Sequence, residues 1–115
     1  MRPIDAGLLA EWAGGELQGD PAASVGPDVV IDSRLVTHGS VFVAIGGERV
    51  DGHDYVADVL AAGAGAALVS RRVDTGGNQI VVDDTIAALS SLARGVVADA
   101  AAGGLVVVGI TGSSG

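Results

Sequence analysis

The sequence has 115 residues, of which 49% are hydrophobic, and it contains no cysteine. This length suits one domain with a packed core, and the lack of cysteine excludes a disulfide framework and any cysteine-based metal site. The formal net charge is −8, with six arginines and no lysine, which disfavours binding to nucleic acid or to an anionic membrane. An anionic ligand would have to be held locally, by arginine, backbone amides or helix N-termini.

Two segments of the sequence bear on where in the cell the protein is found. The first 15 residues carry Asp5 and Glu11 where a secretory signal would be apolar. The apolar run Leu105–Ile110 is far shorter than the about 20 residues that cross a bilayer. We therefore expect a soluble, cytoplasmic protein with no membrane insertion.

The predicted elements begin with a helix at Asp5–Ala13, in which Leu8, Leu9 and Trp12 have helical spacing and Gly14 ends the pattern. Residues 16–27 are rich in glycine, proline and alanine, and they indicate a strand fragment and a loop. From there, apolar β-branched runs alternate with helical patterns. In chain order they predict strands at 29–31 and 40–45, a helix at 55–62, strands at 66–70 and 79–82, a helix at 86–102 and a strand at 105–110.

This alternation predicts an α/β fold whose sheet is mixed or mostly parallel and flanked by helices. In the helix at 55–62, we expect Tyr55, Val56, Val59 and Leu60 to share one apolar face. The cluster Asp83-Asp84-Thr85 supplies a cap for the helix that follows. Because a new strand-to-glycine-loop unit follows that helix, we expect one domain at 1–83 and the start of a second at 84–115.

The first polar cluster, Asp32-Ser33-Arg34, follows a predicted strand, and strand ends are where α/β folds usually bind ligands. Ser33 offers a hydroxyl and a backbone amide, and Arg34 offers a planar fork for phosphate or carboxylate. The alternative is purely structural: Asp32 caps a turn and Arg34 pairs with it. The sequence favours neither.

The second cluster, at 46–54, lies between a strand and a helix. Its glycines allow close backbone approach, and its carboxylates can cap the helix. A metal site or a catalytic His/Asp pair is a weaker alternative, because neither a third ligand nor a nucleophile is specified. Its members are Gly46, Gly47, Glu48, Arg49, Val50, Asp51, Gly52, His53 and Asp54.

The third cluster is Thr111-Gly112-Ser113-Ser114-Gly115, which follows an apolar strand. Consecutive backbone amides in such a loop can cradle phosphate. A strict P-loop has a glycine where this chain has Ile110, and a Lys-Ser/Thr pair after Gly115. A glycine turn that ends a buried strand and a dinucleotide-binding loop remain alternatives.

Taken together, the three clusters resemble the Mur ligase family. The matching segments follow one order: Asp32-Ser33-Arg34, the glycine-led strand 39–45, the stretch 47–55, the segment 63–69, the step at 81–85, and the loop 109–115. The pattern is closest to the family member that joins D-alanyl-D-alanine to UDP-MurNAc-tripeptide. The ligase that adds the third amino acid is the nearest alternative.

The resemblance implies that 1–83 binds the UDP-sugar end of a UDP-MurNAc-peptide and that 84–115 begins an ATP-binding domain. It implies UDP-substrate contacts from Ser33, Arg34, Gly46, Gly47, Glu48 and Arg49, loop shaping by Asp32, Asp51, His53 and Asp54, and ATP-phosphate contacts from Thr111, Gly112, Ser113, Ser114 and Gly115. ATP and Mg²⁺ would serve the full-length enzyme, together with its central and C-terminal domains. In these 115 residues we expect no catalytic residue, no metal ligand and no activity. A free-standing dinucleotide-binding module, or a scaffold for a protein partner, are the rival interpretations.

Overall fold

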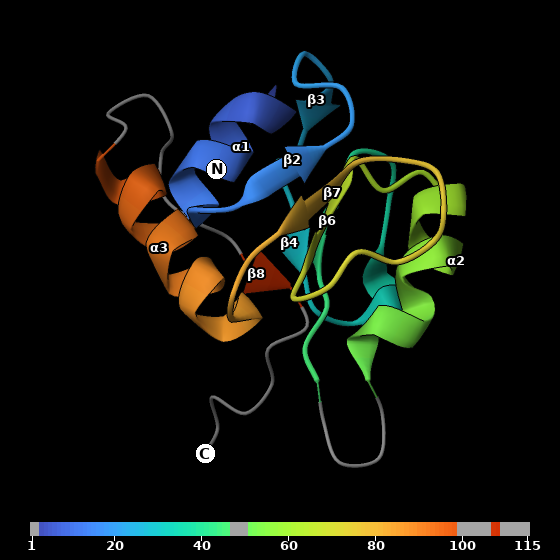
Figure 1. Cartoon of the computed structure of the whole chain (residues 1–115). Coiled ribbons are helices and arrows are strands. Elements are labelled where there is room, and N and C mark those ends of the chain that lie inside the picture. The colour runs from blue at the N-terminus through green and yellow to red at the C-terminus, as the bar shows by residue number, and fades with distance from the viewer. Residues whose placement is uncertain (1–2, 47–50, 99–106, 109–115) are drawn as a thin grey trace.

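In the computed structural model, residues 3–46, 51–98 and 107–108 are described (Figure 1). The chain opens with the short strand β1 (Ile4–Asp5) and helix α1 (Ala6–Ala13). The Asp5 carboxylate caps α1 by accepting the Leu8 N–H at 2.7 Å. Gly14 ends the helix at φ 73°, a left-handed conformation that glycine adopts without a Cβ penalty. The predicted first helix is confirmed, with Asp5 as its cap.

Six strands form one mixed sheet in the spatial order β2-β7-β6-β5-β4-β8. Five of them run parallel, and β2 at one edge is antiparallel to β7. The α/β prediction of a mixed, helix-flanked sheet is therefore confirmed. The strands are β2 (Glu16–Gln18), β4 (Val29–Val30), β5 (Val41–Val43), β6 (Ala66–Val69), β7 (Gln79–Val81) and β8 (Val107–Val108).

Helices cover both faces of this sheet, which explains the nearly continuous apolar strands (Figure 1). Helices α1 and α3 (Thr85–Ala98) lie on one face, and α2 (Val56–Ala61) lies on the other. Neighbouring strand residues point to opposite sides: Val29 packs with the α1 and α3 side, and Val30 packs with the α2 side. One-residue alternation thus builds two cores from the same strands.

The contact between α1 and α3 is close because α3 carries Gly95 beneath Trp12. A Cβ on Gly95 would lie 2.5 Å from Trp12 Cγ. The Ser91 hydroxyl donates to the Trp12 carbonyl at 2.7 Å. Leu92 and Val96 of α3 belong to the same buried cluster as Leu9 of α1. The proposed boundary at 83/84 stays a prediction, and it would divide two packed helices.

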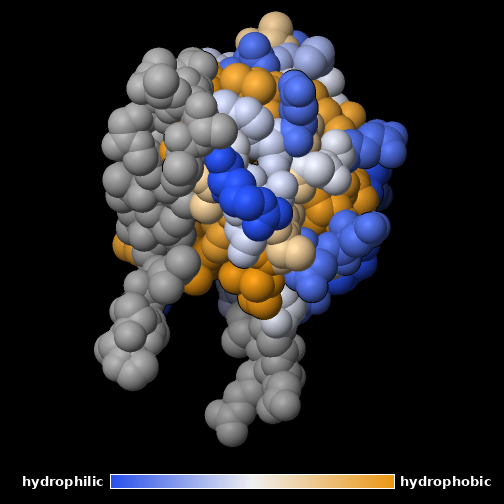
Figure 2. Space-filling model, turned by 90° about the vertical axis from the view of Figure 1, so that its left-hand side faces the viewer, coloured by the Kyte–Doolittle hydropathy of each residue, from blue (hydrophilic) through white to orange (hydrophobic). Residues whose placement is uncertain are grey.

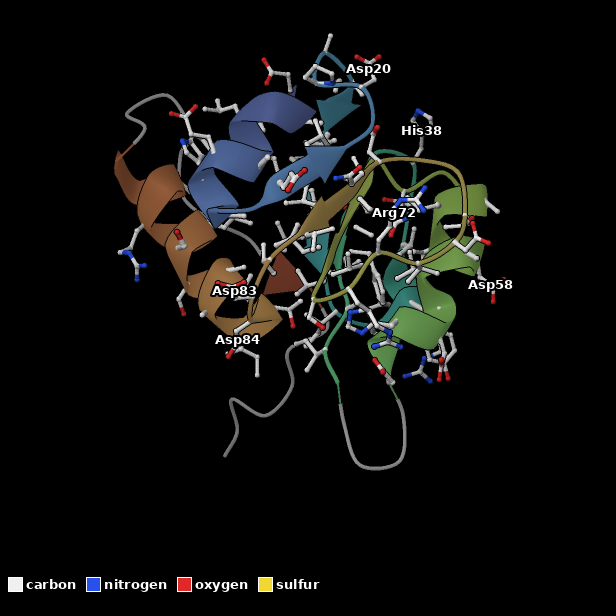
Figure 3. All side chains as sticks on the ribbon, in the orientation of Figure 1. Asp20, His38, Asp58, Arg72, Asp83 and Asp84 are labelled. Carbon is white, nitrogen blue, oxygen red and sulfur yellow. The ribbon has the colours of Figure 1, made fainter. Side chains whose placement is uncertain are left out.

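The start of α3 follows the predicted capping cluster. Asp83 and Asp84 lie side by side at the junction of β7 and α3 (Figure 3). Asp84 is the cap, since its carboxylate accepts the N–H groups of Ile86 at 2.8 Å and Ala87 at 3.2 Å. Ile86 itself is 60% exposed. The side of the molecule formed by α3 shows hydrophobic side chains between hydrophilic ones (Figure 2).

Two features differ from the sequence-based expectation. A separate, unpredicted ribbon pairs β1 with β3 (Ser24–Val25), whereas the strand fragment expected within 16–27 is β2. The predicted helix at 55–62 is confirmed as α2, except that Tyr55 belongs to the preceding 3₁₀ turn, η2 (Gly52–Tyr55). Tyr55 is therefore not on the apolar face with the buried Val56 and Val59, and it is 38% exposed. The expectation for Tyr55 was wrong.

Candidate functional site

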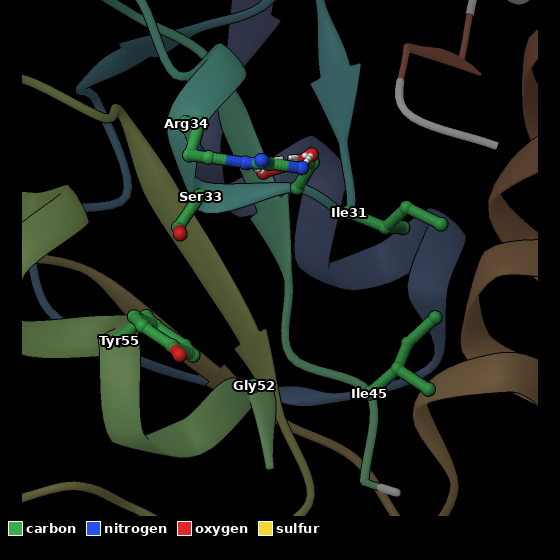
Figure 4. Close-up of a pocket in the computed structure, with 7 residues that line it drawn as sticks. Ile31, Ser33, Arg34, Ile45, Gly52 and Tyr55 are labelled. Atoms are coloured by element: carbon green, nitrogen blue, oxygen red, sulfur yellow. Dashed lines mark hydrogen bonds and ion pairs between the residues drawn. The ribbon is translucent and has the colours of Figure 1, made fainter. Parts of the chain in front are cut away.

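A pocket of about 420 Å³ lies where the carboxyl ends of β4 and β5 meet η2. Parallel strands bring their carboxyl ends to one edge of a sheet, and ligands of open α/β sheets usually bind there. Ser33 and Tyr55 stand on one side of the pocket, and Ile31 and Ile45 stand on the other (Figure 4). The lining residues are Ile31, Asp32, Ser33, Arg34, Ile45, Gly52 and Tyr55.

The first wall is the 3₁₀ turn η1 (Ser33–Leu35), which Asp32 caps. The Asp32 carboxylate accepts the Arg34 N–H at 2.9 Å and the Arg34 guanidinium through Nε at 3.0 Å and Nη2 at 2.6 Å. The side-chain hydrogen bonds from Arg34, followed by the backbone one, lower the pKa of Asp32 to about 2. The side-chain hydrogen bonds to Asp32 and the charge of its carboxylate raise the pKa of Arg34. The carboxylate stays charged and keeps the turn closed.

Arg34 is nevertheless open to solvent, because 86% of its side chain is exposed. A single exposed ion pair contributes little to stability, so the guanidinium can exchange its carboxylate partner for a ligand anion at small cost. Ser33 is half-buried, and its side chain extends toward Tyr55 (Figure 4). The turn thus places a hydroxyl and a guanidinium at the same pocket.

The second wall is η2, which Asp51 caps in the same way. Its carboxylate accepts the His53 N–H at 2.9 Å and contacts His53 Nδ1 at 2.7 Å. Arg71 adds a contact at 3.3 Å. The backbone hydrogen bond from His53, then the side-chain one, lower the pKa of Asp51 to about 2. The His53 ring is buried, and its Nε2 faces Ser70 at the end of β6.

Two other predicted residues, Asp54 and Gly46, do not line the pocket. Asp54 is exposed on η2, and Gly46 is exposed beyond β5 without lining the pocket. Gly47, Glu48 and Arg49 fall outside the described residues, as do Thr111, Gly112, Ser113, Ser114 and Gly115.

Sequence analysis did not assign Ile31, Ile45, Gly52 and Tyr55 to the pocket. A signal was available for Tyr55, which is the only tyrosine and closes a polar stretch rather than an apolar one. Gly52 is required by close approach: its N–H donates to the Ile45 carbonyl at 2.9 Å. A Cβ at Gly52 would lie 2.7 Å from Ile45 N. The glycine therefore lets η2 press against the end of β5.

Residues 3–46, 51–98 and 107–108 offer neither a metal-binding cluster nor a membrane-spanning helix. No group of three or more His, Asp or Glu side chains in these segments is arranged to hold a metal ion. No helix within them has the length and apolar character needed to span a membrane.

The chain as a whole is similar to known proteins. Residues 28–97 match the description "Mur ligase family, catalytic domain". The chain is 44% identical over 116 residues to the UDP-N-acetylmuramoyl-tripeptide–D-alanyl-D-alanine ligase of Escherichia coli strain K12, and covers 24% of that protein. The similarity involves 100% of this chain. The corresponding ligase of Mycobacterium leprae is 41% identical over 108 residues, which cover 76% of this chain and 21% of the relative.

Solved structures agree in fold. A crystal structure of MurF from Acinetobacter baumannii aligns with a TM-score of 0.74 at 34% identity, over 84% of this chain and 21% of that one. MurF from Thermotoga maritima in complex with ADP aligns with a TM-score of 0.58 over 62% of this chain and 17% of that one. The chain thus spans about a quarter or less of the length of the relatives it matches.

Proposed function

Because the chain belongs to the Mur ligase family, we propose that it is the substrate-binding part of an ATP-dependent ligase that adds D-alanyl-D-alanine to UDP-N-acetylmuramoyl-tripeptide. The relatives with 44% and 41% identity carry that activity in their names. A ligase of this kind activates a carboxylate by phosphorylation, and metal and phosphate-loop donors stabilise the transferred charge. Its reaction would serve synthesis of the cell-wall precursor.

The observation that carries the proposal is that the first and second polar clusters of the sequence both contribute residues to one pocket. Asp32-Ser33-Arg34 comes from the end of β4, and Gly52 and Tyr55 come from η2. A guanidinium, a hydroxyl and an aromatic face suit a nucleoside diphosphate, which presents two charged phosphates and a flat base. Ser33, Arg34, Gly46, Gly47, Glu48 and Arg49 would contact it, while Asp32, Asp51, His53 and Asp54 shape the loops.

Binding at this pocket would position a reaction that occurs elsewhere. A remote handle on a long substrate supplies binding energy that orients the reacting end. ATP, with Mg²⁺, would use the loop at 111–115 together with further domains, and those five residues lie outside the described part of the chain. We also propose a cytoplasmic location, since a chain without cysteine fits a reducing compartment.

A second candidate is a ligase that adds L-lysine as the third residue. The UDP-N-acetylmuramoyl-L-alanyl-D-glutamate–L-lysine ligase of Staphylococcus haemolyticus is 36% identical over 90 residues, or 76% of this chain. Both candidates share a substrate with a UDP end and therefore the same pocket. They differ in the amino acid that the whole enzyme joins.

The nucleotide proposal is tested by titrating the ¹⁵N-labelled chain with UDP and, separately, with ATP. We expect UDP to shift the amide signals of Ser33, Arg34 and Tyr55, and ATP at equal concentration to shift them less. UDP shifts confined to other residues would contradict the pocket assignment. A ligase assay of the longer polypeptide, with D-alanyl-D-alanine or L-lysine as the acceptor, separates the two candidates.

A further inference from the structure

We propose that His53 is a positioning residue of the pocket, held as a neutral imidazole with its proton on Nδ1. In this form it ties η2, which carries Gly52 and Tyr55, to the end of β6. The predicted effect on UDP affinity rests on the proposed function, whereas the predicted ring state and the position of the turn do not.

The proton assignment follows from what each ring nitrogen faces. The Ser70 backbone N–H points at His53 Nε2 at 2.9 Å. A backbone N–H can only donate, so Nε2 must offer its lone pair and carry no proton. The other nitrogen, Nδ1, lies 2.7 Å from an Asp51 carboxylate oxygen, which accepts. The two contacts together select one of the two neutral tautomers.

The ring is also sealed from water. His53 is 4% exposed, and a buried imidazole that lost either partner would leave an unpaired polar atom. Asp51, His53 and the Ser70 hydroxyl, 3.1 Å from Nε2, follow the order of a nucleophilic triad. Nε2 accepts the Ser70 N–H at 2.9 Å and, since it carries no proton, it also accepts the Ser70 hydroxyl at 3.1 Å. Both donors come from the residue that follows β6, and we assign to this arrangement the role of holding the turn.

The turn is attached at two points, one to each neighbouring strand. Gly52 bonds to Ile45 beyond β5, and His53 bonds to Ser70 beyond β6. Gly52, Ile45 and Tyr55 all line the pocket. Strands β5 and β6 pair in parallel register, and both attachment points lie within two residues of the ends of these strands. Without the bond to Ser70, η2 would depend on its bond to Ile45 and on the exposed Asp51–Arg71 contact, so we expect Tyr55 to lose its fixed place in the wall.

The ring state is measured on the unaltered, ligand-free chain by long-range ¹H–¹⁵N correlation spectra at neutral pH. We expect Nδ1 of His53 to have the shift of a protonated nitrogen and Nε2 that of an unprotonated one. A proton on Nε2 would overturn the proposal. Because this measurement needs neither a ligand nor a variant, it tests the proposed ring state even if the His53 variants do not fold.

Three variants then test positioning, with UDP as the probe. His53→Gln brings an amide oxygen near the Nε2 position and can still accept the Ser70 N–H, whereas His53→Leu cannot. We expect His53→Leu to weaken UDP binding roughly tenfold, and His53→Gln to recover most of that loss. Ser70→Ala keeps the backbone N–H, so its affinity should stay within about twofold of the unaltered chain. Equal affinities for His53→Leu and the unaltered chain would refute the positioning role.

The same variants separate this proposal from the proposed function. In ligand-free spectra, His53→Leu should move the amide signals of Gly52 and Tyr55, and His53→Gln should leave them nearly unchanged. If the unaltered chain binds no UDP while these shifts appear, the proposed function fails and the positioning of the turn stands. If UDP binds and the shifts do not appear, the positioning role fails alone.

Discussion

The two turns that wall the pocket, η1 and η2, have nearly the same local design and differ in burial. In each, an aspartate caps a 3₁₀ turn by accepting the N–H of the residue two positions later. In each, that later residue also bonds to the same carboxylate through its side chain: Arg34 to Asp32, and His53 to Asp51. Both carboxyl groups have a pKa near 2.

Burial separates their roles. The Arg34 side chain is 86% exposed, and the His53 side chain is 3% exposed. An exposed guanidinium keeps donors free for a ligand, whereas a buried imidazole has both nitrogens occupied by the protein. We infer that η1 presents the binding group and that η2 fixes the part of the wall that carries Gly52 and Tyr55. The same three-residue pattern thus leaves the side chain of Arg34 exposed and encloses that of His53.

The largest expected effect comes from separating η2 from β5. Gly52→Ala would put a Cβ 2.7 Å from Ile45 N and 2.9 Å from Ala44 Cα, and backbone atoms cannot swing aside. We expect a loss of about 1–3 kcal/mol in the free energy of unfolding, measured by urea denaturation. Gly46→Ala is the matched control, since nothing lies within 4 Å of its added Cβ. Equal stability of the two variants would show that η2 is not pressed against β5.

A smaller effect on stability should distinguish the carboxylates of Asp32 and Asp51. Each has a folded-state pKa of about 2 against an ordinary 3.8, so its contribution to stability is complete above about pH 4 and is lost as the pH falls toward 2. Asp51→Asn should lower the melting temperature at pH 7 more than Asp32→Asn, because Asp51 also serves the buried His53. Both differences from the unaltered chain should shrink near pH 2. A larger decrease for Asp32→Asn would reverse the assignment of roles.

The capped turns themselves, which depend on residues close together in the chain, could be predicted from sequence. Asp32-Ser33-Arg34 and Asp51-Gly52-His53 both show an aspartate before a turn, and the apolar run Val41-Phe42-Val43 indicates the strand before η2. Capping depends on neighbours in the chain, and strands buried on both faces leave a continuous apolar signal. Asp84 was predictable for the same reason.

The contacts between residues far apart in the chain could not be predicted. The contact between His53 and Ser70 joins residues 17 positions apart and depends on the register of β5 beside β6. Tyr55 was wrongly predicted to share the apolar face of α2. A 3₁₀ helix has three residues per turn rather than 3.6, so the spacing of the buried residues in α2 does not continue back through η2. The ribbon of β1 and β3 has two residues per strand, which is too short for any periodicity.

The smallest effect on folding, and the most selective effect on binding, should come from Arg34. Since its side chain is exposed, Arg34→Gln should leave the free energy of unfolding within about 0.5 kcal/mol of the unaltered chain. If η1 presents the binding group, the same change should weaken UDP binding roughly tenfold, and added salt should narrow the difference because it screens the lost charge. Calorimetric titration at two ionic strengths measures both effects. Arg94→Gln, an exposed arginine on α3 away from the pocket, is the matched control. Equal losses of UDP affinity for the two variants would mean that UDP affinity depends on the overall charge of the chain. The proposal that η1 presents the binding group while η2 holds the wall in position would then be wrong.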